Sequence, residues 1–209
     1  MLSPVMLSSQ PQHSTTTEGY APPDLTRALD VSAWLQAIPA TATCKGLVGE
    51  SVVDAVPNQK ITAVKFAQFR DYPLRDVASL MVDAARVLCP DAPLREGLAV
   101  VGQALFPAFV GTLLGRVMYG VFGGNVSSIL RMANKSYEQT QNTGRVETAV
   151  VSPTSVRMHF SNCWTFLDSY HVGVVEGTLA ACKVEGVVHV KMTSDIEGYL
   201  LVEWRPRPR

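Results

Sequence analysis

An excess of charge of either sign is missing from this sequence, in which 18 Lys and Arg residues balance 18 Asp and Glu residues. A chain with no net positive charge and no basic helix has no electrostatic field that would gather nucleic acid. The only clustered arginines, Arg205, Arg207 and Arg209, alternate with prolines. We interpret residues 205–209 as a solvated tail, with a phosphate-binding site as the alternative. Nucleic-acid binding is therefore not expected.

Paired cysteines are missing as well. The cysteines Cys44, Cys89, Cys163 and Cys182 form no C-x-x-C motif and stand near no pair of histidines, so a metal site is not expected. The first residues lack both the charged segment and the long apolar segment of a signal peptide. These features together predict reduced thiols and a cytoplasmic protein.

Local catalytic motifs are the third absence. The sequence contains no G-x-S-x-G, H-E-x-x-H, P-loop or G-x-G-x-x-G motif. No histidine has a carboxylate or a second histidine at a spacing that would build a site locally. Catalytic partners distant in the sequence can still meet in a fold, so these absences make catalysis less expected but do not exclude it. We expect a protein that is not an enzyme.

Apolar residues, in contrast, are plentiful. The chain is 47% hydrophobic and only 17% charged, and its mean hydropathy is positive. At 209 residues, this composition predicts one domain with a well-filled core. Residues 98–115 carry no charge and reach the lower limit of a membrane span. Because Gln103 and Pro107 interrupt this run, we expect a buried pair of helices and no membrane span.

The chain divides into three parts. Residues 1–23 are rich in Ser, Thr, Gln and Pro, which is typical of a disordered arm. A single domain is expected over residues 24–204, followed by the tail. Apolar spacing and bounding prolines predict helices over residues 25–38, 46–56, 74–88 and 94–105.

Two further helices are expected before the spacing of apolar residues changes from that of a helix to that of a strand. Pro107 should break or kink the apolar segment, which would continue as a helix to about residue 122. The glycines that follow would end it. Asn125 or Ser127 could then cap one more short helix.

From Gly144 onward the period of apolar residues is that of a strand. Two alternating runs flank a turn at residues 152–154, and two more lie between residues 188 and 204. Each pair predicts a β-hairpin, and a helix from an N-cap at Asp168 to about Lys183 separates them. Each strand has one apolar face and one polar face. The fold class we predict is α+β, with a helical layer on one face of a twisted antiparallel sheet.

His171 is the histidine of greatest interest. At about 100° per residue, it projects with Val175, Thr178 and Cys182 from the apolar side of its helix. It therefore either makes a hydrogen bond inside the core or contacts something held between helix and sheet. His159 and His189 fall on the polar faces of two strands, where solvent exposure is favoured over metal binding.

Several other side chains could line a pocket. The candidates are Phe109, Tyr119 and Trp164 together with His171 and Cys182, and ordinary core packing is the alternative for each. Gly173 and Gly177 stand four residues apart on one helix. That spacing lets a second backbone approach closely, within the domain or across a dimer.

Three segments resemble a known family. They are YPLRDVASLMVDAARVLCPDAPLREGLAVVGQALFPAFVGTLLGRVM, NTGRVETAVV and LDSYHVGVVEGTLAACKVEGVVHVKM. With them the chain resembles an uncharacterised family of proteins of about 200 residues that is multiplied as paralogues in myxobacteria, over approximately residues 44–204.

The late order of strand pair, glycine-bearing helix and strand pair is similar to a wider group. That group comprises vinyl-reductase-type small-molecule-binding domains, haem-based nitric-oxide sensors and vesicle-tethering subunits. The resemblance implies helices against a twisted sheet with an apolar cavity between them. The Tyr-x-Ser-x-Arg motif of the haem sensors and the metal-binding cysteines of the vinyl-reductase type are absent, and no histidine lies in the long helices. No cofactor is therefore expected.

These observations favour a non-catalytic module that senses or carries a small hydrophobic molecule in a pocket. The alternative is a scaffold whose cavity is closed and whose apolar surface forms a homodimer or docks a protein partner.

Overall fold

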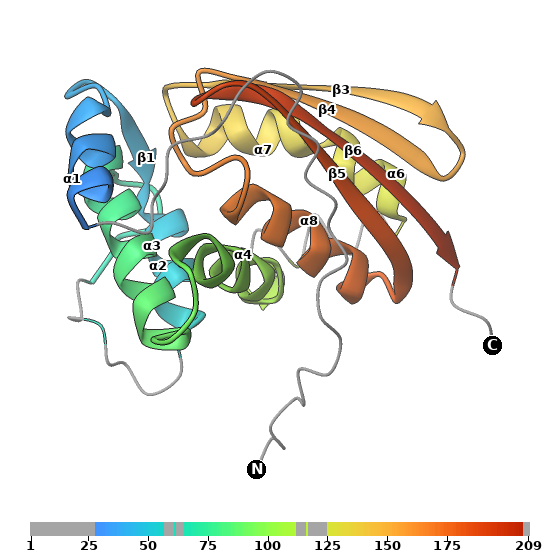
Figure 1. Cartoon of the computed structure of the whole chain (residues 1–209). Coiled ribbons are helices and arrows are strands. Elements are labelled where there is room, and N and C mark those ends of the chain that lie inside the picture. Colours follow the sequence, from blue (N-terminus) through green and yellow to red (C-terminus); the bar gives the residue numbers. More distant parts are fainter. Residues whose placement is uncertain (1–27, 57–60, 62–64, 112–115, 117–124, 207–209) are drawn as a thin grey trace, which may run out of the picture.

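The computed structural model describes residues 28–56, 61, 65–111, 116 and 125–206 (Figure 1). The expected arm, the continuation of the apolar helix to about residue 122 and residues 207–209 lie outside this part of the chain. So does Tyr119. Arg205 and Pro206, assigned to the tail by sequence, belong to the last strand.

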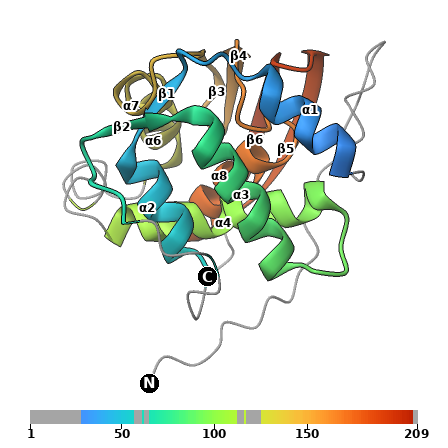
Figure 2. The ribbon, with the colours of Figure 1, turned by 90° about the vertical axis from the view of Figure 1, so that its left-hand side faces the viewer.

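Four helices make up the first half: α1 (Ala28–Ala37), α2 (Gly46–Asp54), α3 (Leu74–Leu88) and α4 (Leu94–Gly111). All four were predicted, and α3 has the bounds that its apolar spacing indicated. Its buried side chains recur every three or four residues, and Cys89-Pro90 ends it. Figure 2 shows α3 in front of α8, with the large sheet behind both.

A break or a kink was expected at Pro107, and the break is wrong, because α4 runs through this residue to Gly111. A proline inside a helix removes the hydrogen bond to the carbonyl four residues earlier, which here belongs to Gln103. That carbonyl lies against Gly177 of α8 (Tyr170–Ala181), where a Cβ would overlap it. The loss inside α4 is thus accommodated at a contact between helices, where a weak Cα–H···O interaction is available.

Two short strands and one helix were not predicted. β1 (Thr43–Lys45) and β2 (Asp71–Pro73) form an antiparallel pair with Thr43 opposite Pro73. After α6 (Val126–Arg131), which Asn125 caps by accepting from the Ser128 N–H, comes α7 (Ala133–Thr140). The α7 sequence, ANKSYEQT, has no apolar period, and Tyr137 is its one buried residue.

The large sheet confirms the predicted hairpins. Its strands are β3 (Arg145–Ser152), β4 (Ser155–Ser161), β5 (Val184–Ser194) and β6 (Glu197–Pro206). They pair antiparallel in the order β3-β4-β6-β5. One face is buried, as alternation indicated, and carries Val146, Val156, Met158, Phe160, Val188, Val190, Met192, Leu200 and Val202.

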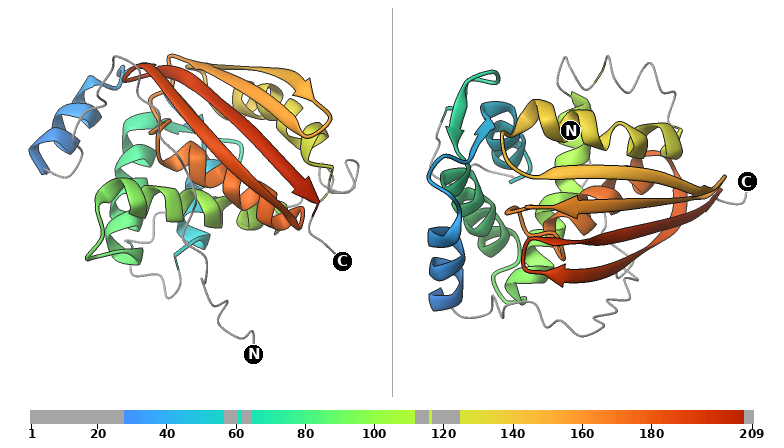
Figure 3. Two further views of the ribbon diagram at one scale, coloured as in Figure 1. Left: turned by 45° about the vertical axis from the view of Figure 1, so that its right-hand side comes forward. Right: turned by 90° about the horizontal axis from the view of Figure 1, so that it is seen from above.

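Helix α8 lies between α4 and this sheet (Figures 1 and 3). Asp168, the expected N-cap, is instead ion-paired with Arg95 of α4, and Ser169 is the residue that precedes the helix. Close packing at Gly173 and Gly177 occurs within the chain, against α4. In the described ranges, no helix is both long and apolar enough to cross a bilayer.

Two hydrophobic cores result from this arrangement. The first joins α1, α2, α3 and α4, and includes Phe166 from the segment leading into α8 and Tyr170 from the first turn of α8. The second joins α6, α7 and α8 to the buried face of the sheet. The predicted α+β class, with helices layered on one face of an antiparallel sheet, is confirmed.

Candidate functional site

A cavity of about 210 Å³ lies where the two cores meet. Its walls come from α2, α4, α6, α7 and α8 and from the buried face of the sheet. Most of the lining is apolar, with Phe106, Phe109 and Val110 from α4 on one side and Val146 and Phe160 from the sheet on another. A concave, largely apolar space of this kind is typical of sites for small molecules.

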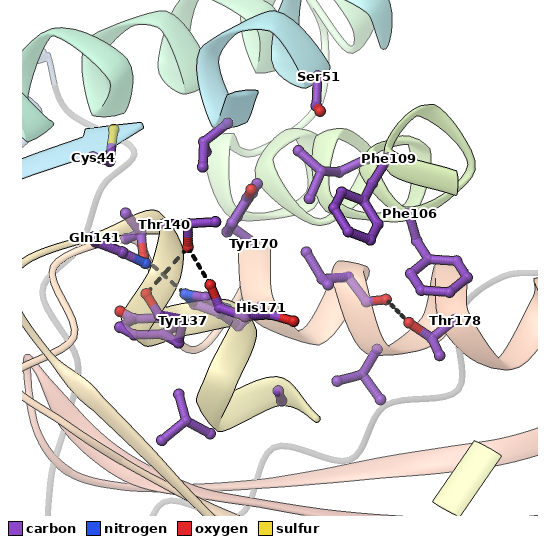
Figure 4. A pocket seen from close by; sticks show the side chains of 18 of the residues that line it. Cys44, Ser51, Phe106, Phe109, Tyr137, Thr140, Gln141, Tyr170, His171 and Thr178 are labelled. Carbon is purple, nitrogen blue, oxygen red and sulfur yellow. Dashed lines mark hydrogen bonds between the residues drawn. The ribbon is translucent and has the colours of Figure 1, made fainter. Parts of the chain in front are cut away.

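Most of the polar side chains of the cavity lie toward one end, while the hydroxyls of Ser51 and Thr178, nearer to Phe109 and Phe106, donate to backbone carbonyls of their own helices (Figure 4). Figure 4 shows Tyr137, Thr140, Gln141 and His171 on one side, and Phe106 and Phe109 on the other. Tyr137 and His171 are neighbours, with ring centroids 5.8 Å apart. This uneven distribution gives the cavity a polar end and an apolar end.

His171 makes an internal hydrogen bond, with its Nε2 2.8 Å from the Thr165 hydroxyl. The rings of Tyr137, Phe160 and Tyr170 surround its imidazole. Of the two roles weighed for His171, the hydrogen bond inside the core is present, and its partner is a side-chain hydroxyl. The ring also lines the cavity.

Burial keeps the titratable groups of the cavity uncharged. It lowers the pKa of His171 to about 3 and raises the pKa of Cys44 to about 12. Burial also raises the pKa values of Tyr137 and Tyr170 far above that of a free phenol. At neutral pH these four groups therefore carry no charge.

The loop between β4 and α8 delivers Thr165 to the site. It contains two residues in the left-handed region, Asn162 with φ of 53° and Phe166 with φ of 54°. Such values are uncommon outside glycine and persist only where surrounding contacts hold them. Phe166 is buried against Trp34 of α1, which anchors the loop.

Gln141 is held at the polar end by its backbone. It follows α7, where its N–H donates to the Tyr137 carbonyl, and it forms an isolated antiparallel bridge with Cys44. The side chain lines the cavity, and its Oε1 is buried without a hydrogen-bond partner. A buried acceptor left in this state is unusual in a native protein.

The structure brings only some of the predicted pocket residues together. His171 and Phe109 line the cavity. Cys182 lies just past α8, half-buried against the core of the sheet, and Trp164 packs on Trp34 with ring centroids 5.7 Å apart. Neither of them belongs to the cavity wall, and Tyr119 lies outside the described residues.

The two strand histidines do not meet, because β6 separates β4 from β5. His159 stacks on Tyr199 and lies 3.2 Å from a Glu197 oxygen, while His189 lies 3.2 Å from a Glu203 oxygen. Among the residues that the structure describes, no group of three His, Cys, Asp or Glu side chains could hold a metal ion.

Sequence reasoning missed Tyr137, Gln141 and Thr165. Tyr137 and Gln141 belong to a helix and a bridge without an apolar period, and Thr165 belongs to an irregular loop. A single aromatic residue in an otherwise polar segment, Tyr137, was the one signal that marked α7 as partly buried.

Solved structures of H-NOX proteins have a similar fold. One is the Fe(II)NO state of an H-NOX protein from S. oneidensis, 13% identical, with a TM-score of 0.62 over 77% of this chain and 99% of that one. Another is an oxygen-binding H-NOX domain related to soluble guanylate cyclases, 16% identical, with a TM-score of 0.53 over 85% of this chain and 93% of that one. A third, which concerns heme distortion in the H-NOX family, is 17% identical, with a TM-score of 0.52 over 78% of this chain and 85% of that one.

The described lining of this cavity does not fit a haem group. Haem iron takes an axial ligand such as histidine or thiolate. His171 is the one imidazole of the described lining and is bonded to Thr165, and the Cys44 thiol is kept protonated by burial. No Lys or Arg stands among the described lining residues to pair with propionates. The likeness to H-NOX proteins is therefore one of fold.

Sequence comparison gives the family. No curated protein matches the chain. The model of a family described as "Protein of unknown function (DUF2378)" matches residues 40–205, which include the cavity, the second core and the first core apart from α1 and Ile38. The chain belongs to the DUF2378 family.

Proposed function

We propose that this protein is a non-catalytic module that binds a small hydrophobic molecule in the cavity between its two cores. The observation that carries the proposal is the cavity itself, with about 210 Å³ of largely apolar space bordered by helices and sheet. The H-NOX proteins supply a precedent of fold, since one of those structures is of an Fe(II)NO ligation state and another is of an oxygen complex.

The energetics favour binding of a molecule of modest size. Burying about 200 Å² of apolar ligand surface contributes roughly 5 kcal/mol at about 25 cal/mol per Å². Lost translational and rotational freedom offsets part of this gain. We therefore expect dissociation constants in the micromolar to millimolar range for simple hydrophobic probes.

The chemistry of the lining supports a binding role over catalysis. Thr165 and His171 have the spacing of a nucleophile and a base, at 2.8 Å. A histidine whose pKa is about 3, however, is too weak a base at neutral pH to activate a hydroxyl. The described lining offers no carboxylate to orient the imidazole.

The test combines identification and competition. Denaturing extraction of freshly purified protein, followed by mass spectrometry, should recover a small hydrophobic compound. Addition of ethylbenzene to emptied protein should raise the melting temperature. The matched control is Ala133→Leu, which places a larger side chain in the cavity wall and should abolish the shift. A protein that yields no compound, and whose stability ignores a hydrophobic panel, would contradict the proposal.

A docking role is the second candidate, and one observation favours it. Val150 and Val151 are 51% and 58% exposed on β3, which is an edge strand of the sheet. Adjacent apolar side chains at an unpaired edge are suited to pairing with another chain. Light scattering over a dilution series tests this role, and a monomer at every concentration would count against self-association.

A further inference from the structure

The polar end of the cavity has an imbalance between hydrogen-bond donors and acceptors. The Thr140 hydroxyl donates to backbone carbonyls of α7, and the Tyr137 hydroxyl donates to the Cys163 sulfur at 3.3 Å. The Gln141 side chain lines this end of the cavity, yet its Oε1 is buried without any partner. What this end lacks is a donor that could reach Gln141.

Folding does not remove the cost of this unpaired oxygen. A buried carbonyl that loses water and gains no donor is destabilising, and a ligand that brings a donor recovers the lost interaction. The backbone bridge between Gln141 and Cys44 fixes the backbone from which this side chain reaches the cavity wall. A ligand that brings a donor would therefore meet an acceptor already placed at the wall.

The rest of the lining excludes ions. None of its described residues is Lys, Arg, Asp or Glu. A carboxylate or ammonium group would lose its hydration without gaining a counter-charge, which is far more costly than burying a neutral group. The occupant that suits this cavity is therefore uncharged.

The size of the cavity limits the occupant further. An engineered apolar cavity of about 150 Å³ in another protein binds benzene. At about 210 Å³, this cavity suits a molecule somewhat larger than benzene. A ring with a short substituent, or an aliphatic chain of equal volume, has the right bulk.

We propose that the ligand is an uncharged molecule, about the size of a substituted benzene ring, whose hydroxyl or amide N–H donates to Oε1 of Gln141. This inference rests on the proposed binding function and adds the class of ligand. The apolar body of the ligand lies toward Phe106 and Phe109, and its donor lies toward Gln141 and His171.

Three probes with one apolar body separate these features. Ethylbenzene has no donor, 4-ethylphenol adds a neutral hydroxyl, and 4-ethylbenzoate adds a negative charge. Their dissociation constants would be measured by calorimetry at pH 7 for the full chain and for Gln141→Leu. The decisive quantity is the affinity for 4-ethylphenol divided by the affinity for ethylbenzene.

We expect this ratio to fall at least fivefold in Gln141→Leu, because the phenol hydroxyl then loses its acceptor inside the cavity. Gln141→Met, which keeps the length of the side chain, should give the same fall. The matched control is Gln36→Leu, the same substitution at an exposed glutamine of α1 that does not line the cavity. Gln36→Leu should leave the ratio unchanged. Unaltered binding of ethylbenzene shows that each variant is folded.

The outcomes distinguish the two proposals. If ethylbenzene binds the unmodified protein but the ratio stays the same in both Gln141 variants, the inference about the donor is overturned and the binding function stands. If 4-ethylbenzoate binds as tightly as 4-ethylphenol, the restriction to uncharged ligands is overturned. If none of the three probes binds, or if Ala133→Leu binds them equally well, the cavity is not the site and both proposals fail.

Discussion

Helix α8 packs very differently along its two sides. Toward α4 the two backbones are in contact, because a Cβ at Gly102, Gly173 or Gly177 would overlap a carbonyl of the facing helix. Toward α7 and the sheet, the same helix borders a cavity of about 210 Å³. Both kinds of packing occur within a single turn of α8, since Gly173 contacts α4 while His171 and Val175 line the cavity.

The difference indicates that the cavity is not a result of loose packing. Protein interiors are close-packed, and surroundings that can relax usually collapse into a void. Here the α4–α8 contact is fixed by glycines, by the Arg95–Asp168 ion pair and by the hydrogen bond from Gln103 to Glu176. A rigid pair of helices cannot move to fill the space beside it, so the cavity persists.

The largest expected effect comes from breaking the closed side. Gly173→Ala would place a methyl group in the carbonyl of Ala99, so the helices must separate. We expect a loss of about 3 kcal/mol in the free energy of unfolding, measured by urea denaturation. Ala180→Ser, at an exposed position on the same helix, should stay within about 0.5 kcal/mol. Equal effects of the two substitutions would refute the close contact.

The next effect is on the cavity side and depends on pH. The pKa of His171 is about 3 in the folded chain and about 6.5 when unfolded, so between these values only the unfolded state binds the proton. Stability should therefore fall on acidification through this window, by about 1.4 kcal/mol per pH unit. His171→Gln lacks this contribution. Unfolding curves at pH 6, 5 and 4 should show a shallower dependence for the variant, and parallel curves would contradict the burial of His171.

Both sides of α8 show what the sequence allowed us to predict. The apolar spacing of α3 and the alternation in the hairpins are local patterns, and each gave its element. The direction of His171 also followed from local geometry, because its position on a helix decides its face. The glycine spacing indicated a close contact and left open which backbone made it.

The misses share a different cause. Pro107 indicated a break or a kink, yet α4 continues through it, and the freed Gln103 carbonyl lies against Gly177, a contact that depends on distant sequence. α7 has no apolar period, since only Tyr137 is buried. Trp164 comes two residues after Asn162, whose backbone is in the left-handed region. A turn of this kind changes the direction of the following side chains, and the spacing of apolar residues does not predict that change.

A smaller effect is expected where the two halves are joined. Asn142, just after α7, accepts from the Thr43 N–H at 2.7 Å and donates to the Thr41 carbonyl at 2.9 Å. Because the site is exposed, water replaces much of what is lost, and Asn142→Ala should cost about 1 kcal/mol. Asn142→Asp keeps the acceptor and should cost less. Urea denaturation measures both, and a larger loss for Asn142→Asp would contradict these roles.

The smallest effect should come from filling the open side. Ala133→Leu adds apolar atoms to the cavity wall at the start of α7, where empty space now lies. Filling a cavity commonly stabilises a protein, and we expect a gain of about 0.5 kcal/mol in the absence of ligand. This sign is opposite to that of Gly173→Ala, although both substitutions enlarge a side chain beside α8. The same denaturation experiment decides the matter, because a loss comparable to that of Gly173→Ala would mean that the space beside α7 is as tightly closed as the space beside α4.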